Sequence, residues 1–524
     1  MTTDLSDFAH DINALFSAFD RPDSPGAVLL VRHHGQEVFC NAWGAESLTF
    51  GRMLTRRSVI RIGSQSKQFT VLLALMLEAE GKLSMSDPVQ KHFPELPVFD
   101  HPVTLYHLAT NTSGWRDHFQ ALVLSGISLY APSTRQATRD RIARQEALNF
   151  APGSALSYSN SGFVLLSDLI EKIEGKPLGD VLKERIFDPL GMADTLLVGW
   201  DGLAVPGLAS HYCTDPEGWF QRNWGLPIGG EGGIASTVDD TALWLDNFDT
   251  ARIGTAEMLA RMQTPPHFPG GQVSGYGMGL VIHDYRGRRF VGHGGSVAGG
   301  RSENGRFVDD GLSVVLLGNC DTVEPLATVR RVADLWFGDA EPPVMPFKPG
   351  RYRQDGGRDV LVVRDHAGGK QMMSAGTVFE RLDCTPPEGA AREAGLISAH
   401  YRPTDTGIAA DYCGVAQTYT PVPDDAQAAR PLTGRYRQDV QGFDVAIDTD
   451  LRQGRFLLTS DQGVFRGHLA AVDRDLWILR AGEVPKDGPP ARAVPWMAAL
   501  QAVDGGFVLD TARNKGLTFK TTEQ

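Results

Sequence analysis

The sequence predicts an α+β fold, in which helices flank an antiparallel sheet and two small all-β barrel domains follow. Strand-like runs occur near the start of the chain and again much later, with helical patterns between them: 26–32, 37–43, 279–284, 289–293 and 312–317. These runs can pair into one antiparallel sheet that the helices cover. Because a repeat occupies the last third of the chain, we expect three domains, at residues 1–338, 345–425 and 431–524.

The elements of the first domain follow from local patterns. A helical pattern spans residues 5–19, and His33-His34-Gly35-Gln36 joins the first two strand-like runs as a hairpin turn. The segment from Phe69 to Ala79 is apolar on nearly every side, which is typical of a buried helix, and Gly81 follows its end. Further along, we expect a short helix closed by a turn at 104–114, a loop at 151–162 and a helix at 163–174. A glycine-rich loop is expected at 227–236, followed by a helix that starts near residue 237.

The last third of the chain contains an internal repeat. The hexapeptide Gly350-Arg-Tyr-Arg-Gln-Asp355 recurs as Gly434-Arg-Tyr-Arg-Gln-Asp439, with a period of 84 residues. A proline-rich linker at 341–350 precedes the first unit, and a second linker lies at 421–430. Each unit consists of short strand patterns and turns, so we expect a small barrel or sandwich for each.

Composition excludes several classes of partner. The chain has 524 residues and a net charge of −13, which argues against nucleic acid or an anionic membrane surface as the main partner. Its five cysteines are scattered without the spacing of a metal site, as is typical of free thiols in a reducing compartment. The acidic start of the chain lacks the features of an export signal, and no run is long enough to cross a bilayer. We therefore expect a cytoplasmic protein.

Ser64 and Lys67 are the first candidate catalytic pair. They stand three residues apart at the start of the buried helix, so their side chains share one helix face. A serine hydroxyl needs a neighbouring base before it can attack a carbonyl, and a lysine that is partly desolvated has a pKa lowered towards the working range. The helix N-terminus also favours the negative charge that develops during acyl transfer. The alternative is a surface serine and lysine that merely share a face.

Tyr158 and Asn160 are the second candidate element. Tyr158-Ser159-Asn160 is the only Tyr-x-Asn in the chain and lies on the expected 151–162 loop. A phenol there could relay the proton of the serine, and the amide could bind a substrate carbonyl. The alternative is a turn tyrosine in a loop rich in serine and asparagine.

His293 is the third candidate element. It stands at the end of a strand-like run, and Gly294 and Gly295 follow it, so a substrate could approach the strand edge, where backbone amides can bind an oxyanion. A histidine in a strand can instead be purely structural. His33 with Gly35 also fits His-x-Gly, but it lies in the expected hairpin turn and is the weaker candidate.

These motifs, taken in order, resemble the signatures of the penicillin-recognising serine hydrolases: SxxK, then YxN, then a strand motif of KTG or HxG type. The resemblance covers residues 20–338 and includes GKLSMSDPV, HLATNTSG and APGSALSYSNSG. It implies a catalytic domain like that of the β-lactamases and D,D-peptidases. Together with the two repeated β units, the whole chain is similar to the bacterial D-stereospecific aminopeptidases.

The resemblance implies a role for each motif. Ser64 would attack the scissile carbonyl, and Lys67 with Tyr158 would take and return the proton. The backbone amides of Ser64 and Ser296 would form the oxyanion hole, Asn160 would orient the substrate, and His293 would stand where other members have lysine. An acyl-enzyme would form and be hydrolysed, with no metal or organic cofactor.

Two features of the sequence bear on the choice of substrate. A histidine is mostly neutral at pH 7, so His293 does not supply the fixed positive charge that binds a substrate carboxylate. An aminopeptidase needs an anion for the substrate ammonium, and in the resembling aminopeptidases a loop of the last β domain enters the cleft. The best candidate for that loop is 481–490, in which Glu483 or Asp487 could bind the amine. The alternative is a solvated hairpin tip.

The resemblance therefore implies an exopeptidase that releases an amino-terminal D-residue, such as D-alanine, from small peptides, amides or esters. An esterase, a D,D-carboxypeptidase or a β-lactamase on the same scaffold is the alternative among enzymes. A protein that is acylated once and acts as a sensor or binding protein is the alternative outside them. The resemblance also implies a homodimer.

Overall fold

The structure of the chain is a computed structural model. The structure describes residues 4–215, 217–339, 347–366, 370–375, 378–385, 390–393, 399–412, 415–423, 432–438, 443–450, 455–460, 463–481, 497–511 and 513–522. Among them no helix combines the length and the apolar character that crossing a membrane would need.

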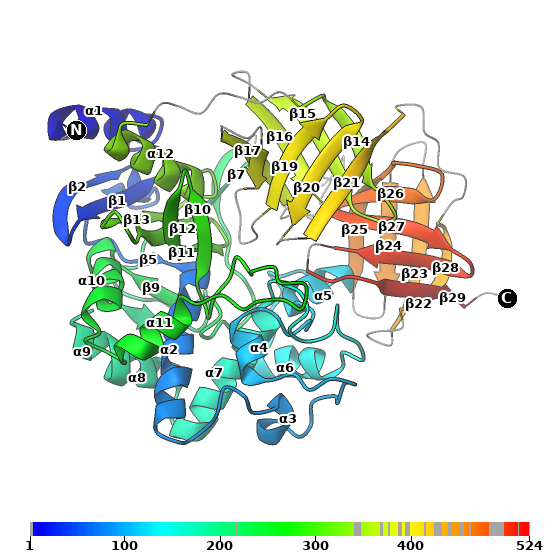
Figure 1. The fold of residues 1–524 in the computed structure, drawn as a ribbon, viewed down its shortest axis with the longest axis horizontal. Coiled ribbons are helices and arrows are strands. Elements are labelled where there is room, and N and C mark those ends of the chain that lie inside the picture. Colours follow the sequence, from blue (N-terminus) through cyan, green and yellow to red (C-terminus); the bar gives the residue numbers. More distant parts are fainter. Residues whose placement is uncertain are drawn as a thin grey trace.

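A six-stranded antiparallel sheet forms the centre of the first domain (Figure 1). Its strands, in spatial order, are β10 (Val281–Tyr285), β11 (Arg288–Val297), β12 (Gly300–Phe307), β13 (Leu312–Gly318), β1 (Ala27–His33) and β2 (Gln36–Trp43). The predicted pairing of the early hairpin with the late strands is confirmed, through the register of Ala27 opposite Gly318. The sequence did not reveal β12, which pairs with β11 and places Asn304 opposite His293.

Side chains of the sheet alternate between two cores. On β1, Val28 and Leu30 belong to the core shared with the central helices, whereas Leu29 and Val31 belong to the core on the other face. Helices α1 (Leu5–Leu15) and α12 (Pro325–Phe337) cover that second face. This alternation is the period expected of a strand that is buried on both sides.

The other helices pack against the first face or extend the domain below it (Figure 1). The predicted buried helix is α2 (Ser66–Ala79), where all but three residues are buried, and Gly81 follows it with φ of +72°. Helix α7 (Asn160–Glu174) packs on α2, and α10 (Val238–Thr250) begins after Thr237 as expected. The remaining helices are α3 (Val89–His92), α4 (Leu105–Ala109), α5 (His118–Leu124), α6 (Arg135–Ala143), α8 (Leu178–Leu182), α9 (Asp188–Leu190) and α11 (Ala256–Met262).

Short strands join distant segments near the start of α2. Strand β9 (Ile234–Ser236) lies between β5 (Ile60–Arg61) and β6 (Leu196–Leu197), so the glycine-rich segment that precedes β9 runs beside the segment that precedes α2. The other two pairs are β3 (Ala45–Ser47) with β4 (Arg52–Met53), and β7 (Tyr212–Asp215) with β8 (Gly218–Gln221).

The last third of the chain forms two closed eight-stranded barrels. The first contains β14 (Gly350–Gln354), β15 (Val360–His366), β16 (Lys370–Ala375), β17 (Val378–Thr385), β18 (Ala390–Glu393), β19 (Ala399–Thr404), β20 (Gly407–Tyr412) and β21 (Val415–Val422). The second contains β22 (Gly434–Gln438), β23 (Phe443–Asp450), β24 (Arg455–Ser460), β25 (Val464–Ala471), β26 (Leu476–Ala481), β27 (Met497–Val503), β28 (Gly506–Asp510) and β29 (Leu517–Thr521).

The repeated hexapeptide opens each barrel. Gly350 and Gly434 begin β14 and β22, and the tyrosine two residues later is buried in both copies. Its hydroxyl donates to the carbonyl four residues upstream, from Tyr352 to Lys348 at 2.6 Å and from Tyr436 to Leu432 at 3.3 Å. The repeat therefore fixes how the chain enters each barrel.

The second barrel docks on the first domain beside α5 (Figure 1). Leu124 belongs to the same apolar cluster as the barrel interior, and the Ser460 hydroxyl donates to the Ser125 carbonyl at 2.8 Å. Gly126 and Gly463 approach so closely that a Cβ on either would lie inside contact distance of the other backbone. The barrel is thus held against the end of α5 by backbone-level packing.

Candidate active site

Ser64 lies in a single 3₁₀ turn (Gly63–Gln65) that runs directly into α2. Gly63 has φ of +56°, a conformation that favours glycine, and a Cβ on it would lie 2.7 Å from the Ser296 backbone nitrogen. The glycine therefore lets the turn touch the edge of β11. Ser64 remains partly exposed, while Lys67 one turn later is fully buried.

The Lys67 amine contacts three oxygen atoms. Its Nζ lies 3.0 Å from Ser64 Oγ, 2.8 Å from Asn160 Oδ1 and 2.5 Å from the Glu231 backbone oxygen. Two of these partners are carbonyl oxygens, which can only accept. A neutral amine has two hydrogens and one lone pair, so the two carbonyls use both hydrogens and the lone pair faces the Ser64 hydroxyl. In that state the hydroxyl donates to the amine, which is the geometry of a general base.

Burial favours this neutral state. It lowers the pKa of Lys67 to about 7, with the charges of Glu231 and Asp117 acting against burial and that of Arg513 acting with it. Near neutral pH a large fraction of Lys67 therefore lacks its proton. A serine hydroxyl with such an amine beside it is equipped for nucleophilic attack.

Tyr158 faces the same pair. Its ring centroid lies 4.9 Å from Lys67 Nζ, and its buried hydroxyl has no hydrogen-bond partner of ordinary geometry among the described residues. Burial raises the pKa of Tyr158, while the charge of Arg513 and the Ser64 hydroxyl act in the opposite direction. The phenol therefore keeps its proton at neutral pH, and its hydroxyl can both donate and accept a hydrogen bond.

Asn160 links Lys67 to a buried carboxylate. Its Oδ1 accepts from Lys67, and its Nδ2 donates to Asp117 Oδ2 at 2.8 Å. Its backbone nitrogen, at the start of α7, donates to the same oxygen at 2.8 Å. Burial raises the pKa of Asp117, but the positive charge of Arg513 and backbone hydrogen bonds outweigh burial and lower the pKa overall. Asn160 thus orients the lysine directly, a contact that the sequence did not reveal.

His293 is fully buried on β11, and both of its ring nitrogens are occupied. Nδ1 lies 2.6 Å from the Gly294 carbonyl oxygen and Nε2 lies 3.0 Å from the Tyr276 hydroxyl. Burial and the charge of Lys67 lower the pKa of His293 to about 3, so the ring is neutral. A carbonyl can only accept, so Nδ1 carries the hydrogen and Nε2 accepts from Tyr276. The ring also lies 6.1 Å from that of Tyr158, centroid to centroid.

Ser296 stands at the exposed edge of β11. Its hydroxyl accepts from Arg301 Nη1 at 2.8 Å, and its backbone nitrogen lies against Gly63. The amides of Ser64 and Ser296 therefore belong to two segments in direct contact. His33 lies elsewhere: it is the last residue of β1, just before the turn in which it was expected, and its ring lies against those of His34 and Trp336.

Glu231 contacts Lys67 from the glycine-rich loop. Its carbonyl accepts from Lys67, and its side-chain Oε1 accepts from the Gly229 amide at 2.9 Å and from Arg135 at 2.8 Å. Burial raises the pKa of Glu231, but the charge of Arg135 and backbone amides outweigh it and lower the pKa. The expected glycine-rich loop thus presents a backbone carbonyl to the Lys67 amine.

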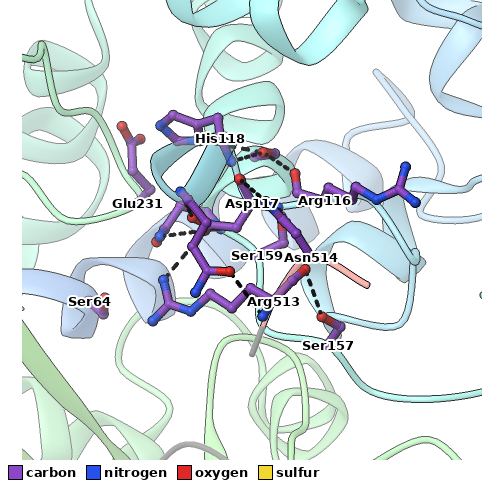
Figure 2. Close-up of polar contacts among 12 residues, drawn as sticks. Ser64, Arg116, Asp117, His118, Ser157, Ser159, Glu231, Arg513 and Asn514 are labelled. Carbon is purple, nitrogen blue, oxygen red and sulfur yellow. Dashed lines mark hydrogen bonds and ion pairs between the residues drawn. The ribbon is translucent and has the colours of Figure 1, made fainter. Parts of the chain in front are cut away.

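A loop of the second barrel reaches this site from the other side. It lies between β28 and β29, and in Figure 2 its Arg513 side chain runs past Asp117 on the side where Ser64 lies. Arg513 Cζ is 4.8 Å from the Tyr158 ring centroid, and Nη1 is 3.5 Å from Asp117 Oδ2. Entry of a loop of the last β unit was expected, but at residues 481–490. Glu483 and Asp487 lie outside the described residues.

The structure brings together Ser64, Lys67, Tyr158, Asn160 and His293 with four residues that sequence reasoning missed: Asp117, Glu231, Tyr276 and Arg513. Asp117 had a visible signal, because an aspartate just before a helix is a favoured N-cap, and its carboxylate does accept from Gln120 of α5. Nothing local marks Tyr276 or Arg513. Among the residues that the structure describes, no group of three or more His, Cys, Asp or Glu side chains is placed to hold a metal ion.

The chain is similar to two D-aminopeptidases and to a penicillin-binding protein homologue of known structure. The D-aminopeptidase of Brucella melitensis biotype 1 is 27% identical over 496 residues, which cover 88% of this chain and 90% of the relative. The D-aminopeptidase of Cereibacter sphaeroides is 32% identical over 320 residues, 61% of each chain. The structure of the octameric penicillin-binding protein homologue from Pyrococcus abyssi matches with a TM-score of 0.57 and 20% identity, and covers 98% of this chain and 99% of that one.

The Pyrococcus abyssi structure aligns with nearly the full length of this chain, so the likeness in fold extends beyond the first domain. The sequence profile of the Beta-lactamase family matches residues 12–335, which is more than half of the chain. The chain therefore belongs to the Beta-lactamase family.

Proposed function

We propose that this chain is a serine aminopeptidase that releases amino-terminal D-residues, D-alanine among them, from small peptides, amides or esters. The observation that carries the hydrolase part is the Lys67 amine, whose two carbonyl partners leave its lone pair for the Ser64 hydroxyl. The aminopeptidase part is supported by the relatives named D-aminopeptidase, of which one aligns with 88% of this chain.

In the proposed mechanism Ser64 Oγ attacks the scissile carbonyl as its proton moves to Lys67 Nζ. The oxyanion is held by the amides of Ser64 and Ser296, at the contact between the nucleophile turn and β11. The proton then reaches the leaving amine through the Tyr158 hydroxyl, which closes the first half-reaction as an ester on Ser64. Water attacks that ester with the same amine as base, and Ser64 is regenerated.

In this proposal His293 acts through its neighbours. Both ring nitrogens are already bonded, to Gly294 and to Tyr276, so the imidazole fixes the β11 edge and does not bind substrate. A neutral ring here supplies no positive charge to a substrate carboxylate, which argues against a D,D-carboxypeptidase or β-lactamase.

The test is a pair of chromogenic anilides: D-alanine p-nitroanilide with a free amine, and the same compound with an acetylated amine. We expect rapid multiple turnover of the free amine and little of the acetylated form, with the L-alanine anilide as the stereochemical control. Faster turnover of the acetylated compound overturns the aminopeptidase assignment in favour of an esterase or carboxypeptidase. A single burst of acylation without turnover indicates a sensor.

We also propose that Glu483 or Asp487 binds the substrate ammonium. Glu483→Gln or Asp487→Asn is expected to raise KM for the free-amine anilide and to leave the acetylated anilide unaffected. Asp444→Asn, at an exposed position of the same barrel, is the matched control. Unchanged KM in both variants would place the amine site elsewhere.

Two further parts of the proposal concern assembly and location. We propose a homodimer, and light scattering of the purified chain is expected to give twice the monomer mass. A monomer mass, or an octamer as in the Pyrococcus abyssi homologue, would overturn it. A cytoplasmic location is supported by the free thiols of Cys40 and Cys320, and cell fractionation tests it.

A further inference from the structure

The loop between the last two strands is built into the wall of the site. Asn514 is buried, its Oδ1 accepts from the Asp117 amide at 2.8 Å, and its Nδ2 donates to the Asp117 carbonyl at 3.3 Å. Within the loop, the Asn514 amide donates to Thr511 Oγ1 at 2.9 Å, and the Thr511 amide donates to the Asn514 carbonyl at 2.7 Å. The side-chain amide of Asn514 thus bonds both the backbone N–H and the backbone carbonyl of Asp117.

Side chains of the first domain hold the loop on both sides of Asn514. Asn149 Nδ2 donates to the Arg513 carbonyl at 2.7 Å, and Asn149 Oδ1 accepts from the Lys515 amide at 2.8 Å. Gln120 Oε1 accepts from the Arg513 amide at 3.1 Å, and Arg116 Nη2 donates to the Lys515 carbonyl at 2.8 Å. Because so many backbone groups of the loop are bonded, the backbone of Arg513, from which the side chain extends, is held in place.

The guanidinium of Arg513 contacts two groups of the site. It lies over the Tyr158 ring, at 4.8 Å from its centroid, and its Nη1 lies 3.5 Å from Asp117 Oδ2. The Arg513 side chain keeps 29% of its surface exposed, while the Asp117 side chain is fully buried. A guanidinium over an aromatic face gains from both charge and stacking. The Arg513 guanidinium therefore restrains the Tyr158 ring and balances the negative charge of the Asp117 carboxylate, which orients Asn160.

Arg513 is also close to the catalytic amine. The Lys67 and Arg513 cationic groups each lie within 5 Å of the Tyr158 ring centroid, so they are at most about 10 Å apart. Two positive charges at this distance in a buried site repel each other, which disfavours the protonated lysine. The charged and titratable groups that face Lys67 come from several elements: Glu231, Asp117, Tyr158, His293 and Arg513.

We propose that Arg513 is a positioning residue of the hydrolytic site, by which the second barrel holds Tyr158 in place and keeps Lys67 in its neutral, proton-accepting form. The barrel loop would then be part of the catalytic machinery of the first domain. This inference rests on the proposed acyl transfer through Ser64. It does not depend on which acyl group the enzyme removes.

The test compares three variants of the full chain: Arg513→Gln, Arg513→Lys and Lys515→Gln. Lys515 is the matched control, because it lies on the same loop and carries the same charge, and among the described residues only its backbone groups bond to the first domain. The kcat/KM of each variant is measured between pH 5 and pH 9 on the free-amine D-alanine anilide and on an activated ester. Thermal unfolding verifies that each variant is folded.

For Arg513→Gln we expect kcat to fall about tenfold at pH 7 with little change in KM, since the effect acts on proton transfer. The acid limb of the profile should move about half to one pH unit higher, because the charge that lowered the pKa of Lys67 is gone. Arg513→Lys should restore the position of the limb, and Lys515→Gln should match the wild type.

An acid limb that stays in place in a folded Arg513→Gln variant overturns the proposal. If Arg513→Gln does not fold, an Arg513→Lys variant with a displaced limb and lowered kcat overturns the charge role equally well. The measurement on the activated ester makes the test of Arg513 independent of the proposed aminopeptidase function. A wild type that hydrolyses the ester but no D-alanyl anilide refutes the aminopeptidase assignment and leaves the Arg513 comparison valid.

Discussion

Lys67 carries the chemical argument at the scale of single residues. Its three contacts could suit an ammonium ion, but burial works against the charge, and the two carbonyl partners suffice for the hydrogens of a neutral amine. Asn160 and Glu231 hold these carbonyls in place because each is bonded in turn, to Asp117 and to Arg135. The neutral amine is thus favoured by its surroundings as a whole, and no single neighbour accounts for it.

The pH dependence of activity follows from Lys67. The pKa of its amine is lowered to about 7, so the active neutral form is lost as the pH falls below that value. We expect kcat/KM to drop about tenfold for each pH unit below the limb. A rate that stays constant down to pH 5 would contradict the role of Lys67 as the base.

Lys67→Arg replaces the titratable amine with a permanent cation. A guanidinium stays protonated at every accessible pH and cannot accept the serine proton. We expect kcat to fall at least a thousandfold, within the range known for loss of a general base together with its geometry. Lys176→Arg, at an exposed ion pair with Glu184, is the control and should leave kcat unchanged.

At the scale of elements, the site depends on the contact between the 3₁₀ turn of Ser64 and the edge of β11. Gly63 permits this contact through both its positive φ and its lack of a side chain. Gly295 does the same from the strand side, since a Cβ there would collide with the Ile62 carbonyl. The two glycines bring together the amides that we propose as the oxyanion hole.

Gly63→Ala should therefore damage catalysis more than stability. Its Cβ would push the Ser296 amide away, and a displacement of about 1 Å in such a site can cost a hundredfold in rate. The matched control is Gly81→Ala, which has the same sign of φ, +72°, but no atom within 4 Å of the added Cβ. We expect kcat/KM to fall about a hundredfold in the first variant only.

A similar loss in both variants would mean that backbone strain, and not the contact with β11, explains the effect. Thermal unfolding of the two proteins measures that strain separately. Each should lose about 1 kcal/mol from the conformational cost of a side chain at positive φ.

The same elements show what sequence alone can predict. Ser64 and Lys67 were found because their relation is local, one turn of a helix, and α2 was recognised because nearly all its residues are apolar. Strand β12 was missed because it carries Ser302, Asn304 and Arg306 towards the helices, where they bond to other polar groups, and its sequence shows no apolar alternation. A strand whose buried residues are polar has no pattern to detect.

The parts of the site that could not be predicted depend on distant pairing. Asp117 and Asn160 are 43 residues apart, and Asp117 and Asn514 are 397 apart, so no local spacing relates them. Entry of a barrel loop was anticipated from the family resemblance alone. That Arg513 reaches the site from the last hairpin follows only from how the barrel docks on α5.

At the scale of the whole molecule, the second barrel completes the wall of the site. The contact between Gly463 and Gly126 sets how closely the barrel approaches the end of α5, and hence where Arg513 lies. The first barrel supports the second through ion pairs from Arg353 to Asp473 at 2.7 Å and to Asp475 at 2.9 Å. Activity should therefore respond to substitutions far from Ser64.

Gly463→Val tests this dependence. The added side chain would collide with the Gly126 backbone and lift the barrel from α5, so we expect kcat/KM to fall between about tenfold and a hundredfold. Hydrogen exchange of the α5 amides should become faster in parallel. Val503→Phe, at an exposed position of the same barrel, should change neither. A Gly463→Val variant with faster exchange in α5 but full activity would contradict a catalytic role for barrel docking.

The most direct test of the account is the site of acylation. The protein is mixed with an activated D-alanyl ester, quenched with acid during turnover and digested, and its peptides are analysed by mass spectrometry. The account predicts one added D-alanyl group on the peptide that contains Ser64, and none in Ser64→Ala, which should also be inactive. An adduct on another residue, or full activity in Ser64→Ala, would contradict it.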